Sequence, residues 1–188
     1  MKIGLVQINN SFDAFYLPLA VGCLQAYALA KAPNPDRYEF MPPKYKRADI
    51  HQYAYDLVDA DVVFFSFYTW NAKMSLALAW ELKKRKPDIL TIFGGPHVPN
   101  HLPLDPDRVK RFLFENPCID IAVHGEGEQP FAAILENIEN DWRKIPSISY
   151  FDKDGEFRAT MRALRLSKEE IDALPSPYLT GVSEPLMQ

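Results

Sequence analysis

Residues 88–99 read Asp-Ile-Leu-Thr-Ile-Phe-Gly-Gly-Pro-His-Val-Pro (DILTIFGGPHVP), and this stretch decides the fold. Four apolar side chains around Thr91 form a short run that is typical of a parallel strand covered on both faces. Gly94 and Gly95 then remove two side chains at the carboxyl end of the strand, where open α/β sheets bind their ligands. For two glycines taken alone a tight strand-to-loop turn is the more ordinary explanation, so the neighbouring segments must decide between a turn and a site.

Strand and helix patterns alternate on both sides of this stretch. Apolar runs predict strands at 3–8, 37–41, 59–67, 89–93 and 118–123, and the intervening segments predict helices at 17–31, 49–58, 71–86, 107–115 and 129–139. This alternation favours a Rossmann-like (flavodoxin-like) α/β fold, with a five-stranded parallel sheet flanked by helices. The flavodoxin-like strand order 2-1-3-4-5 puts the ends of the first and third strands at the topological switch point.

The pattern changes after residue 145. Two alternating segments flank the turn sequence Asp-Lys-Asp-Gly at 152–155, which predicts a β-hairpin. A capping box at Ser167 and Glu170 follows, and then several prolines. We therefore divide the chain into a Rossmann-like domain (1–145), a β-hairpin extension (146–165) and a linker that leaves the domain (166–188).

Composition excludes several classes of partner. The 188 residues carry a formal net charge of −4, and no dense basic stripe offers a surface to nucleic acid. The apolar segment at 17–30 falls short of the roughly 20 residues of a membrane span, and Met1 leads directly into a strand rather than a secretory signal. Cys23 and Cys118 form no Cys-x-x-Cys pair, so we expect no metal centre and no disulfide framework, and a reducing cytoplasm.

Four loops should meet at the carboxyl edge of the sheet: 9–16, 66–71, 94–100 and 124–129. The loop at 66–71 combines hydroxyl groups with three large aromatic side chains, a lining that suits a broad, largely apolar ligand. The alternative is that Phe67 and Trp70 simply cap the core.

The other chemical motifs point away from catalysis by this chain. Gly125-Glu126-Gly127-Glu128 lacks a third glycine and brings two carboxylates to any phosphate, so it does not predict a dinucleotide site. His97 and His101 lie in a proline-rich segment that opposes the helix a zinc pair at this spacing needs. No Gly-x-Ser-x-Gly elbow positions a nucleophile. We therefore predict no catalytic residue and no metal ligand.

Together, six segments resemble the N-terminal cobalamin-binding domain of the cobalamin-dependent radical S-adenosylmethionine enzymes. They are LPLAVGCLQAYA (17–28), VVFFSFYTWN (62–71), FGGPH (93–97), VHGEGEQPF (123–131), SISYFDKDGEF (147–157) and LPSPYLTG (174–181). Each motif is weak alone, but their order and spacing are specific, and the resemblance covers essentially the whole chain. It implies a cobalamin-binding domain whose corrin ring lies between the sheet edge and a radical SAM domain of the same polypeptide.

The resemblance also implies which residues contact the cofactor. Gly94 and Gly95 let the nucleotide tail pass close to the backbone, Ser66 hydrogen-bonds the tail, and residues 68–70 approach the lower face of the cobalt. The implied cobalamin contacts are Asn10, Phe12, Leu17, Ser66, Phe67, Tyr68, Thr69, Trp70, Gly94, Gly95, Pro96, His97, Gly125, Glu126 and Gly127.

Two motifs are absent, one found in other cobalamin proteins and one found in radical S-adenosylmethionine enzymes. The Asp-x-His-x-x-Gly motif that supplies a cobalt-ligating histidine is missing after the first strand, where Asp13, Phe15 and Pro18 hold that spacing. We expect no histidine ligand, and Asp49-Ile50-His51 is better explained as a helix cap. The Cys-x-x-x-Cys-x-x-Cys that holds a [4Fe-4S] cluster is missing too. The cluster and S-adenosylmethionine therefore belong to the parent enzyme, which the resemblance implies is a methyltransferase using methylcobalamin, and this chain alone should not turn over.

Two alternatives stay open. A receiver-like or flavodoxin-like interaction domain without a corrin would share the fold, but a receiver needs an acidic cluster after the first strand, where only Asp13 occurs. A nucleotide-sugar transferase fragment would need a carboxylate or basic pair for a diphosphate, and the edge loops offer only Glu126 and Glu128.

Overall fold

The structure is a computed structural model, and it describes residues 1–11, 16–100, 105, 107–139 and 141–187. Its strands are β1 (Lys2–Val6), β2 (Glu39–Phe40), β3 (Val62–Ser66), β4 (Leu90–Gly94), β5 (Ile121–Val123), β6 (Ile148–Phe151) and β7 (Phe157–Ala159). Its helices are α1 (Leu19–Lys31), α2 (Ile50–Leu57), α3 (Ala72–Arg85), α4 (Arg108–Glu115), α5 (Glu128–Asn137) and α6 (Lys168–Asp172). Short 3₁₀ turns occur at Pro35–Arg37, Trp142–Lys144 and Glu184–Leu186.

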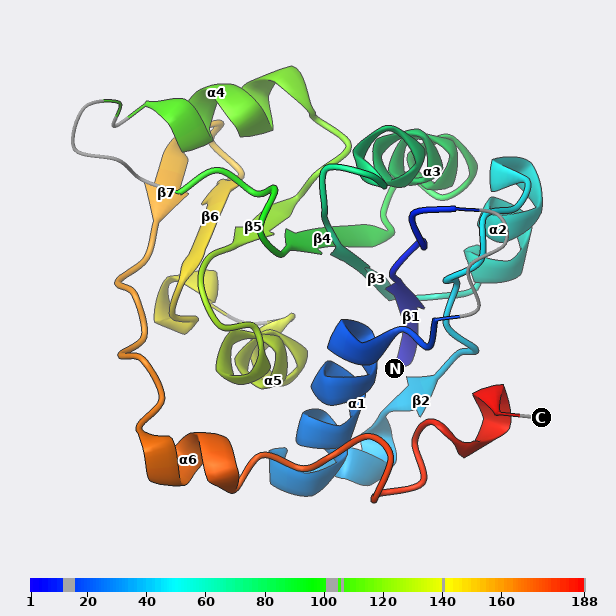
Figure 1. The fold of residues 1–188 in the computed structure, drawn as a ribbon. Helices are drawn as coiled ribbons and strands as arrows, with labels where there is room; N and C mark the ends of the chain where they lie inside the picture. The colour runs from blue at the N-terminus through cyan, green and yellow to red at the C-terminus, as the bar shows by residue number, and fades with distance from the viewer. Residues whose placement is uncertain (12–15, 101–104, 106, 140, 188) are drawn as a thin grey trace.

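One mixed sheet forms the centre of the fold, with strand order β2-β1-β3-β4-β5-β6-β7. The first five strands run parallel, so the predicted order 2-1-3-4-5 is confirmed. Helices α2, α3 and α4 cover one face and helices α1 and α5 cover the other (Figure 1). The fold class predicted from the alternation is therefore correct.

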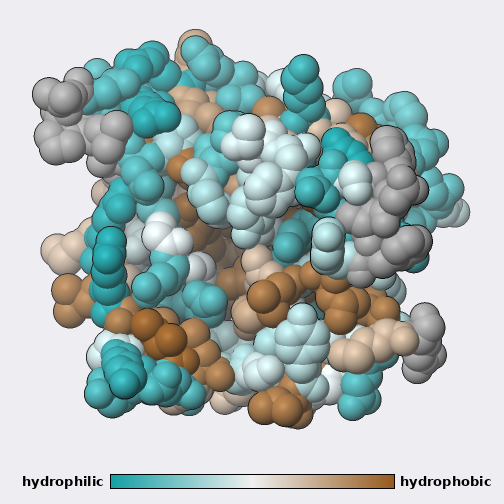
Figure 2. All heavy atoms as spheres, viewed as in Figure 1, coloured by the Kyte–Doolittle hydropathy of each residue, from teal (hydrophilic) through white to brown (hydrophobic). Residues whose placement is uncertain are grey.

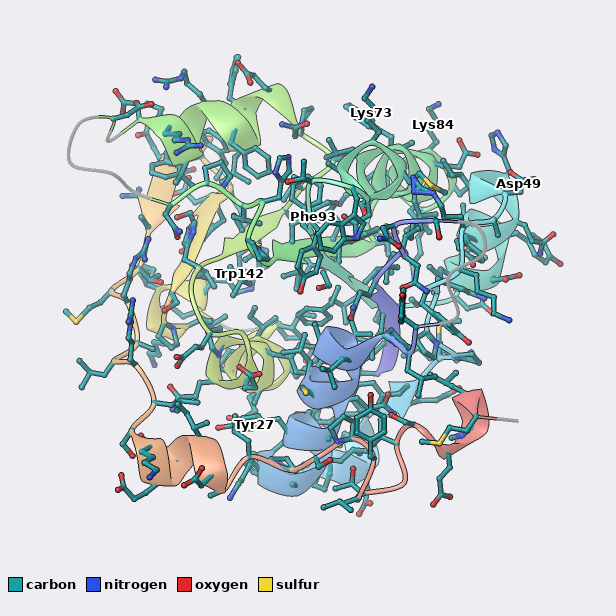
Figure 3. All side chains as sticks on the ribbon, in the orientation of Figure 1. Tyr27, Asp49, Lys73, Lys84, Phe93 and Trp142 are labelled. Atoms are coloured by element: carbon teal, nitrogen blue, oxygen red, sulfur yellow. The ribbon has the colours of Figure 1, made fainter. Side chains whose placement is uncertain are left out.

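Alternation of side chains along the strands creates two separate apolar layers. Val63, Phe65 and Phe93 point towards α2, α3 and α4, whereas Phe64 and Ile92 point towards α1 and α5. Phe93 lies inside the protein between sheet and helices, while Lys73 and Lys84 extend from the outer side of α3 (Figure 3). Burial on both faces explains why the central strands read as continuous apolar runs.

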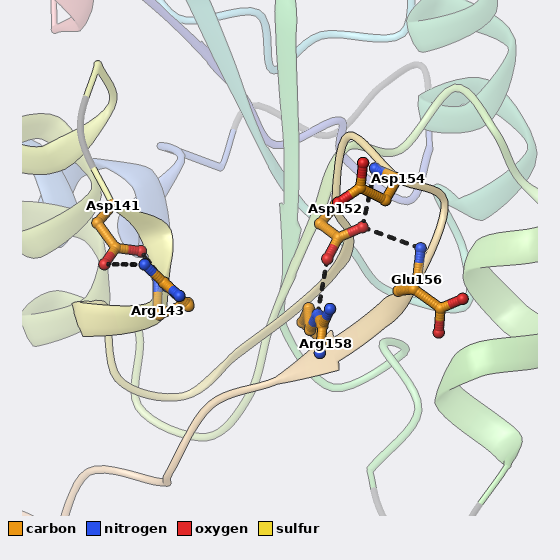
Figure 4. A network of polar contacts seen from close by, with 6 residues as sticks. All are labelled: Asp141, Arg143, Asp152, Asp154, Glu156 and Arg158. Atoms are coloured by element: carbon orange, nitrogen blue, oxygen red, sulfur yellow. Dashed lines mark hydrogen bonds and ion pairs between the residues drawn. The ribbon is translucent and has the colours of Figure 1, made fainter.

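The hairpin departs from the expectation of a separate extension. β6 pairs antiparallel with β5, aligning Ser149 with Ala122, and β7 pairs with β6, so the sheet has seven strands rather than five. The reason is that β5 would otherwise leave an apolar strand edge unpaired. The 152–155 turn occurs as predicted: one carboxylate oxygen of Asp152 accepts the backbone N–H groups of Asp154 and Glu156, and the other accepts Arg158 Nε at 2.7 Å (Figure 4).

Residues at the C-terminal end lie against α1. A Cβ placed on Gly22 would come within 3.2 Å of the Pro177 side chain, and Ser183 is buried beside it. Helix α1 is therefore covered on one side by the sheet and α5 and on another by this segment (Figure 1). That double covering explains why its apolar residues are not confined to a single face. The division into 1–145, 146–165 and 166–188 remains a prediction.

Candidate ligand cavity at the carboxyl edge of the sheet

Four parallel strands end side by side at one edge of the sheet. Pairing aligns Leu5 with Phe64, Phe64 with Ile92, and Ile92 with Ile121, which forms one row of side chains across the α1/α5 face. Two residues further along each strand, a second row follows, made of Gln7, Ser66, Gly94 and Val123. The second row is the last one before the strands end. A cavity on this face of the sheet would therefore have its mouth at the second row.

A cavity of about 490 Å³ lies between these two rows of the sheet and helices α1 and α5. Its volume falls in the range of roughly 300–1,000 Å³ that small-molecule sites occupy. It is lined by Gln7, Leu19, Ala20, Cys23, Leu24, Phe64, Phe65, Ser66, Tyr68, Ile92, Gly94, Gly95, Val123, Gly125, Gly127, Glu128 and Phe131. Figure 2 looks onto this edge and shows a recess near the middle of the face, with apolar residues visible inside it.

Glycines make the room at the mouth. Gly94 has no side chain in the second row, and a Cβ built there would only touch Val123, at 3.5 Å. Gly95 differs, because its φ is +115° and a Cβ would lie 2.9 Å from the Phe67 carbonyl oxygen. Gly125 also has a positive φ, of 76°. The two consecutive glycines therefore have separate roles: Gly95 permits the turn, and Gly94 leaves space.

The polar groups of the lining are few. Gln7 Oε1 accepts the backbone N–H of Val21 at 3.1 Å, which leaves its amide nitrogen as the donor for a ligand. Ser66 is 8% exposed and supplies a hydroxyl that can donate or accept. Burial, and then the Glu128 carboxylate, raises the pKa of the Cys23 thiol, so Cys23 lines the cavity as a neutral, weakly polar group.

An internal hydrogen-bond network fixes the aromatic loop after β3. Asn71 is fully buried; its amide nitrogen donates to the carbonyl oxygens of Ile8 and Ser66, and its oxygen accepts the N–H of Tyr68. The rings of Tyr68 and Trp70 stack at 4.4 Å, and Trp70 is half exposed. Asn71 thus joins the ends of β1 and β3 and holds a flat aromatic surface at the edge.

The structure groups only part of the predicted contact set around the cavity. The members that line it are Ser66, Tyr68, Gly94, Gly95, Gly125 and Gly127. Thr69, Trp70, Pro96 and His97 are exposed at the same edge, with Thr69 Oγ1 3.4 Å from His97 Nδ1. Asn10 is exposed in the loop after β1, Leu17 is partly buried just before α1, and neither lines the cavity; Phe12 lies outside the described residues.

Two predicted contacts lie elsewhere for clear geometric reasons. Phe67 is 1% exposed and packs on Phe93 at a ring distance of 5.1 Å, because it follows Ser66 and therefore faces the α2/α3/α4 side. This matches the core-capping alternative for its ring. Glu126 lines a neighbouring polar cavity of about 320 Å³, where its carboxylate accepts the N–H of Leu166.

Sequence reasoning missed most of the cavity's walls. Leu19, Ala20, Cys23 and Leu24 come from α1, and Glu128 and Phe131 come from α5. Phe64, Ile92 and Val123 come from β3, β4 and β5, and Gln7 directly follows β1. Residues two apart in a strand share a face, so the predicted contacts Ser66 and Gly94 were the signal that could have found Phe64 and Ile92. The helical residues gave no such signal, because an apolar helix does not reveal which of its faces borders an opening.

Within the described ranges, no three His, Cys, Asp or Glu side chains are grouped so that they could hold a metal ion. The described part of the chain also contains no helix long and apolar enough to cross a membrane. His124 is buried, with Nε2 2.9 Å from Ser149 Oγ, and His51 lies on α2 with Nδ1 3.3 Å from a Glu81 carboxylate oxygen. His51 and His124 are thus engaged by side chains within the fold.

Open α/β sheets bind cofactors outside the carboxyl ends of their strands, and this is where the apolar, glycine-lined cavity lies in this chain. The family model "B12 binding domain" matches residues 18–135. The chain belongs to the B12 binding domain family.

Curated relatives agree with this family. The chain is 34% identical over 172 residues to "Cobalamin-dependent radical SAM methyltransferase TokK" of Streptomyces tokunonensis. It is 33% identical over 172 residues to "2-(S-pantetheinyl)-carbapenam-3-carboxylate methyltransferase" of Streptantibioticus cattleyicolor. Each match covers 90% of this chain but only 24% of the relative, so the chain spans about a quarter of their length.

Solved structures share the fold. The cobalamin-dependent S-adenosylmethionine radical enzyme OxsB, with aqua-cobalamin and S-adenosylmethionine bound, matches with a TM-score of 0.64 at 19% identity over 98% of this chain and 25% of its own. The radical S-adenosylmethionine methyltransferase TsrM from Kitasatospora setae, with cobalamin and a [4Fe-4S] cluster bound, matches with a TM-score of 0.56 at 16% identity. That match covers 89% of this chain and 30% of TsrM.

Proposed function

We propose that this chain is the cobalamin-binding domain of a radical SAM enzyme, a methyltransferase that acts through methylcobalamin. The observation that carries the proposal is the cavity between β1, β3, β4, β5 and helices α1 and α5, inside a chain of the B12 binding domain family. The two relatives that are methyltransferases by name support the reaction class.

The cavity fits the nucleotide tail of cobalamin. It is mostly apolar, and a side chain at Gly94 would project into it, so the missing Cβ is a condition for entry. Ser66 and the amide nitrogen of Gln7 supply hydrogen bonds where the strands end. These two groups would hold the polar part of the tail, with its phosphate on the sheet side of the mouth and away from the Glu128 carboxylate of α5, and the apolar row of Phe64 and Ile92 below them would exclude water from the base of the nucleotide.

The flat corrin ring would rest on the edge above. The stacked Tyr68 and Trp70 rings and the exposed backbone around Gly95 offer a broad, planar support. When bound, cobalamin supplies a cobalt centre that can carry a methyl group. The residues of this chain bind and orient it, and the rest of the predicted contact set, including Asn10, Phe12 and Leu17, belongs to this proposal.

We propose no histidine ligand to cobalt from this domain. His51 and His124 are engaged by Glu81 and Ser149, and neither lines the cavity. His97 lies at the edge, but its Nδ1 faces Thr69 Oγ1. With the base of the tail held in the cavity, the lower side of the ring would face the aromatic loop.

Binding of hydroxocobalamin tests the first part of the proposal. The purified chain should retain the cofactor through gel filtration and give the visible spectrum of a protein-bound cobalamin without a histidine ligand. Circular dichroism of the same sample reports whether the fold is intact. A folded chain that retains no cobalamin would contradict the proposal, and a yellow protein carrying FMN would favour the flavodoxin-like alternative.

The remaining parts concern the parent polypeptide. We propose that a radical SAM domain holding the [4Fe-4S] cluster and S-adenosylmethionine is the partner of this domain in the same polypeptide. The two free cysteines, Cys23 and Cys118, support a reducing cytoplasm as the compartment. Reconstituting the parent with iron, sulfide and cobalamin, and following a labelled methyl group from S-adenosylmethionine, tests the reaction.

A further inference from the structure

The closed end of the cavity differs in chemistry from its mouth. Phe64 and Ile92 form the lower row of the sheet, and Phe131 covers them from α5; they are 4%, 1% and 2% exposed. The rings of Phe64 and Phe131 are 4.3 Å apart and tilted by 59°. Leu24 of α1 adds a hydrocarbon wall between this end and the mouth, since its Cδ2 lies 3.3 Å from where a Cβ on Gly127 would be. A ring inserted here meets carbon atoms.

The polar groups lie nearer the mouth. Gln7 and Ser66 stand in the upper row, one row beyond Phe64 and Ile92. Glu128 begins α5, a full turn before Phe131, and Tyr68 follows β3. Among the remaining lining side chains, only Cys23 carries a polar atom; burial, and then the Glu128 carboxylate, raises its pKa, so it is a neutral thiol and a weak hydrogen-bond donor.

We infer that this closed end selects corrinoids by the base of their nucleotide, and that it favours a dimethylbenzimidazole over an adenine. The inference rests on the proposed function, because it assumes that the nucleotide tail enters the cavity. Dimethylbenzimidazole presents two methyl groups at its far edge, which match Phe64, Ile92 and Phe131. Adenine presents an exocyclic amine and ring nitrogens, which would be buried without partners.

The expected discrimination follows from that desolvation. Burying a polar group without a hydrogen bond weakens binding roughly tenfold to 100-fold on the scale seen in protein variants. A corrinoid with adenine in its nucleotide should therefore bind this chain about 10 to 100 times more weakly than cobalamin. Cobinamide, which has the corrin ring but no nucleotide, should also bind more weakly, since it leaves the cavity unfilled.

Equilibrium dialysis of the chain against three probes tests the inference: hydroxocobalamin, the adenine-containing analogue and cobinamide. The variant Leu24→Gln places an amide in the wall on a residue type that suits a helix, and it should raise the affinity for the adenine analogue relative to cobalamin. Leu29→Gln is the matched control, because Leu29 is an exposed residue of the same helix outside the cavity, and it should leave the ratio unchanged.

The outcomes separate the two proposals. If the folded chain retains none of the three probes, the proposed function fails. If cobalamin and the adenine analogue bind equally well, cobalamin binding stands and base selection is overturned. If the two bind differently but Leu24→Gln leaves their ratio as it is in the unmodified chain, the assignment of selectivity to this wall is overturned.

Discussion

Replacement of Gly94 by valine should separate ligand binding from stability. Gly94 is the one position in the upper row of the cavity that carries no side chain, and its backbone is that of an ordinary strand residue. A Cβ there meets only Val123, at 3.5 Å, which is normal van der Waals contact. The folded chain should therefore accept Gly94→Val.

The size of both effects can be worked out from the structure. The three added carbons each take up about as much space as a water molecule, so together they fill roughly 90 Å³ of a cavity of about 490 Å³. A ligand forced to pack against them loses about 1–3 kcal/mol, or roughly 5- to 150-fold in affinity. Stability should move the other way, because a β-branched residue replaces glycine in a strand and adds roughly 0.5–1 kcal/mol to the free energy of unfolding.

Two measurements check this prediction on Gly94→Val and on a control variant. Equilibrium dialysis with hydroxocobalamin gives the affinity, and thermal unfolding followed by circular dichroism gives the stability. Leu90→Val is the control, since it changes the same strand two rows below Gly94 and outside the cavity. Unchanged cobalamin affinity in Gly94→Val would refute the placement of the tail in this cavity. A strongly lowered melting temperature would refute the claim that the Gly94 position has room.

Three further predictions concern other positions. Gly95→Ala should lower the free energy of unfolding by about 1–3 kcal/mol, measured by urea denaturation, because its φ of +115° suits glycine; an unchanged midpoint contradicts this. Bound cobalamin should protect Cys23 from iodoacetamide, followed by mass spectrometry, while Cys118, fully buried with its pKa raised to about 11, reacts with or without ligand only after unfolding. The Lys44 ammonium, 2.6 Å from the Asp56 carboxylate, holds the pKa of that carboxyl below its ordinary value of 3.8. The stabilisation of the folded chain by this ion pair is therefore present above pH 3.8 and is lost as the pH falls through the pKa of the folded state. Asp56→Asn should therefore lower the free energy of unfolding at pH 7 by less than about 1 kcal/mol and leave it unchanged at a pH low enough to protonate Asp56. An equal loss at pH 7 and at the low pH contradicts this prediction.

Much of the fold could be predicted because its signals are local. Continuous apolar runs at β3 and β4 indicated strands buried on both faces, and the two glycines at the carboxyl end of β4 indicated where the sheet edge would be open. The helix boundaries agree within a few residues, and the Asp49 cap at the start of α2 is present. These features depend on the side chains of one segment and the burial it needs.

The pairing of the hairpin could not be read in the same way. The sequence of residues 147–160 specifies two strands and a turn, but not the sheet that they join. Which edge they cover depends on β5, about 25 residues earlier, which pairs with β4 on one edge and has no parallel strand on the other. Pairing between distant strands is a choice among competing edges, and that choice is made only when the sheet assembles.

The sequence by itself determined the parallel α/β architecture, the edge where the loops meet and the glycines that leave room there, because strand burial and backbone freedom are written in short stretches. Only the tertiary structure decided which residues surround that room. Cys23, Leu24 and Phe131 border the cavity because α1 and α5 dock on the sheet at particular rotations, and Phe67 turns away from it because it follows Ser66 in the pleat. Docking depends on contacts between distant segments, including the C-terminal residues against α1, and no local pattern encodes them.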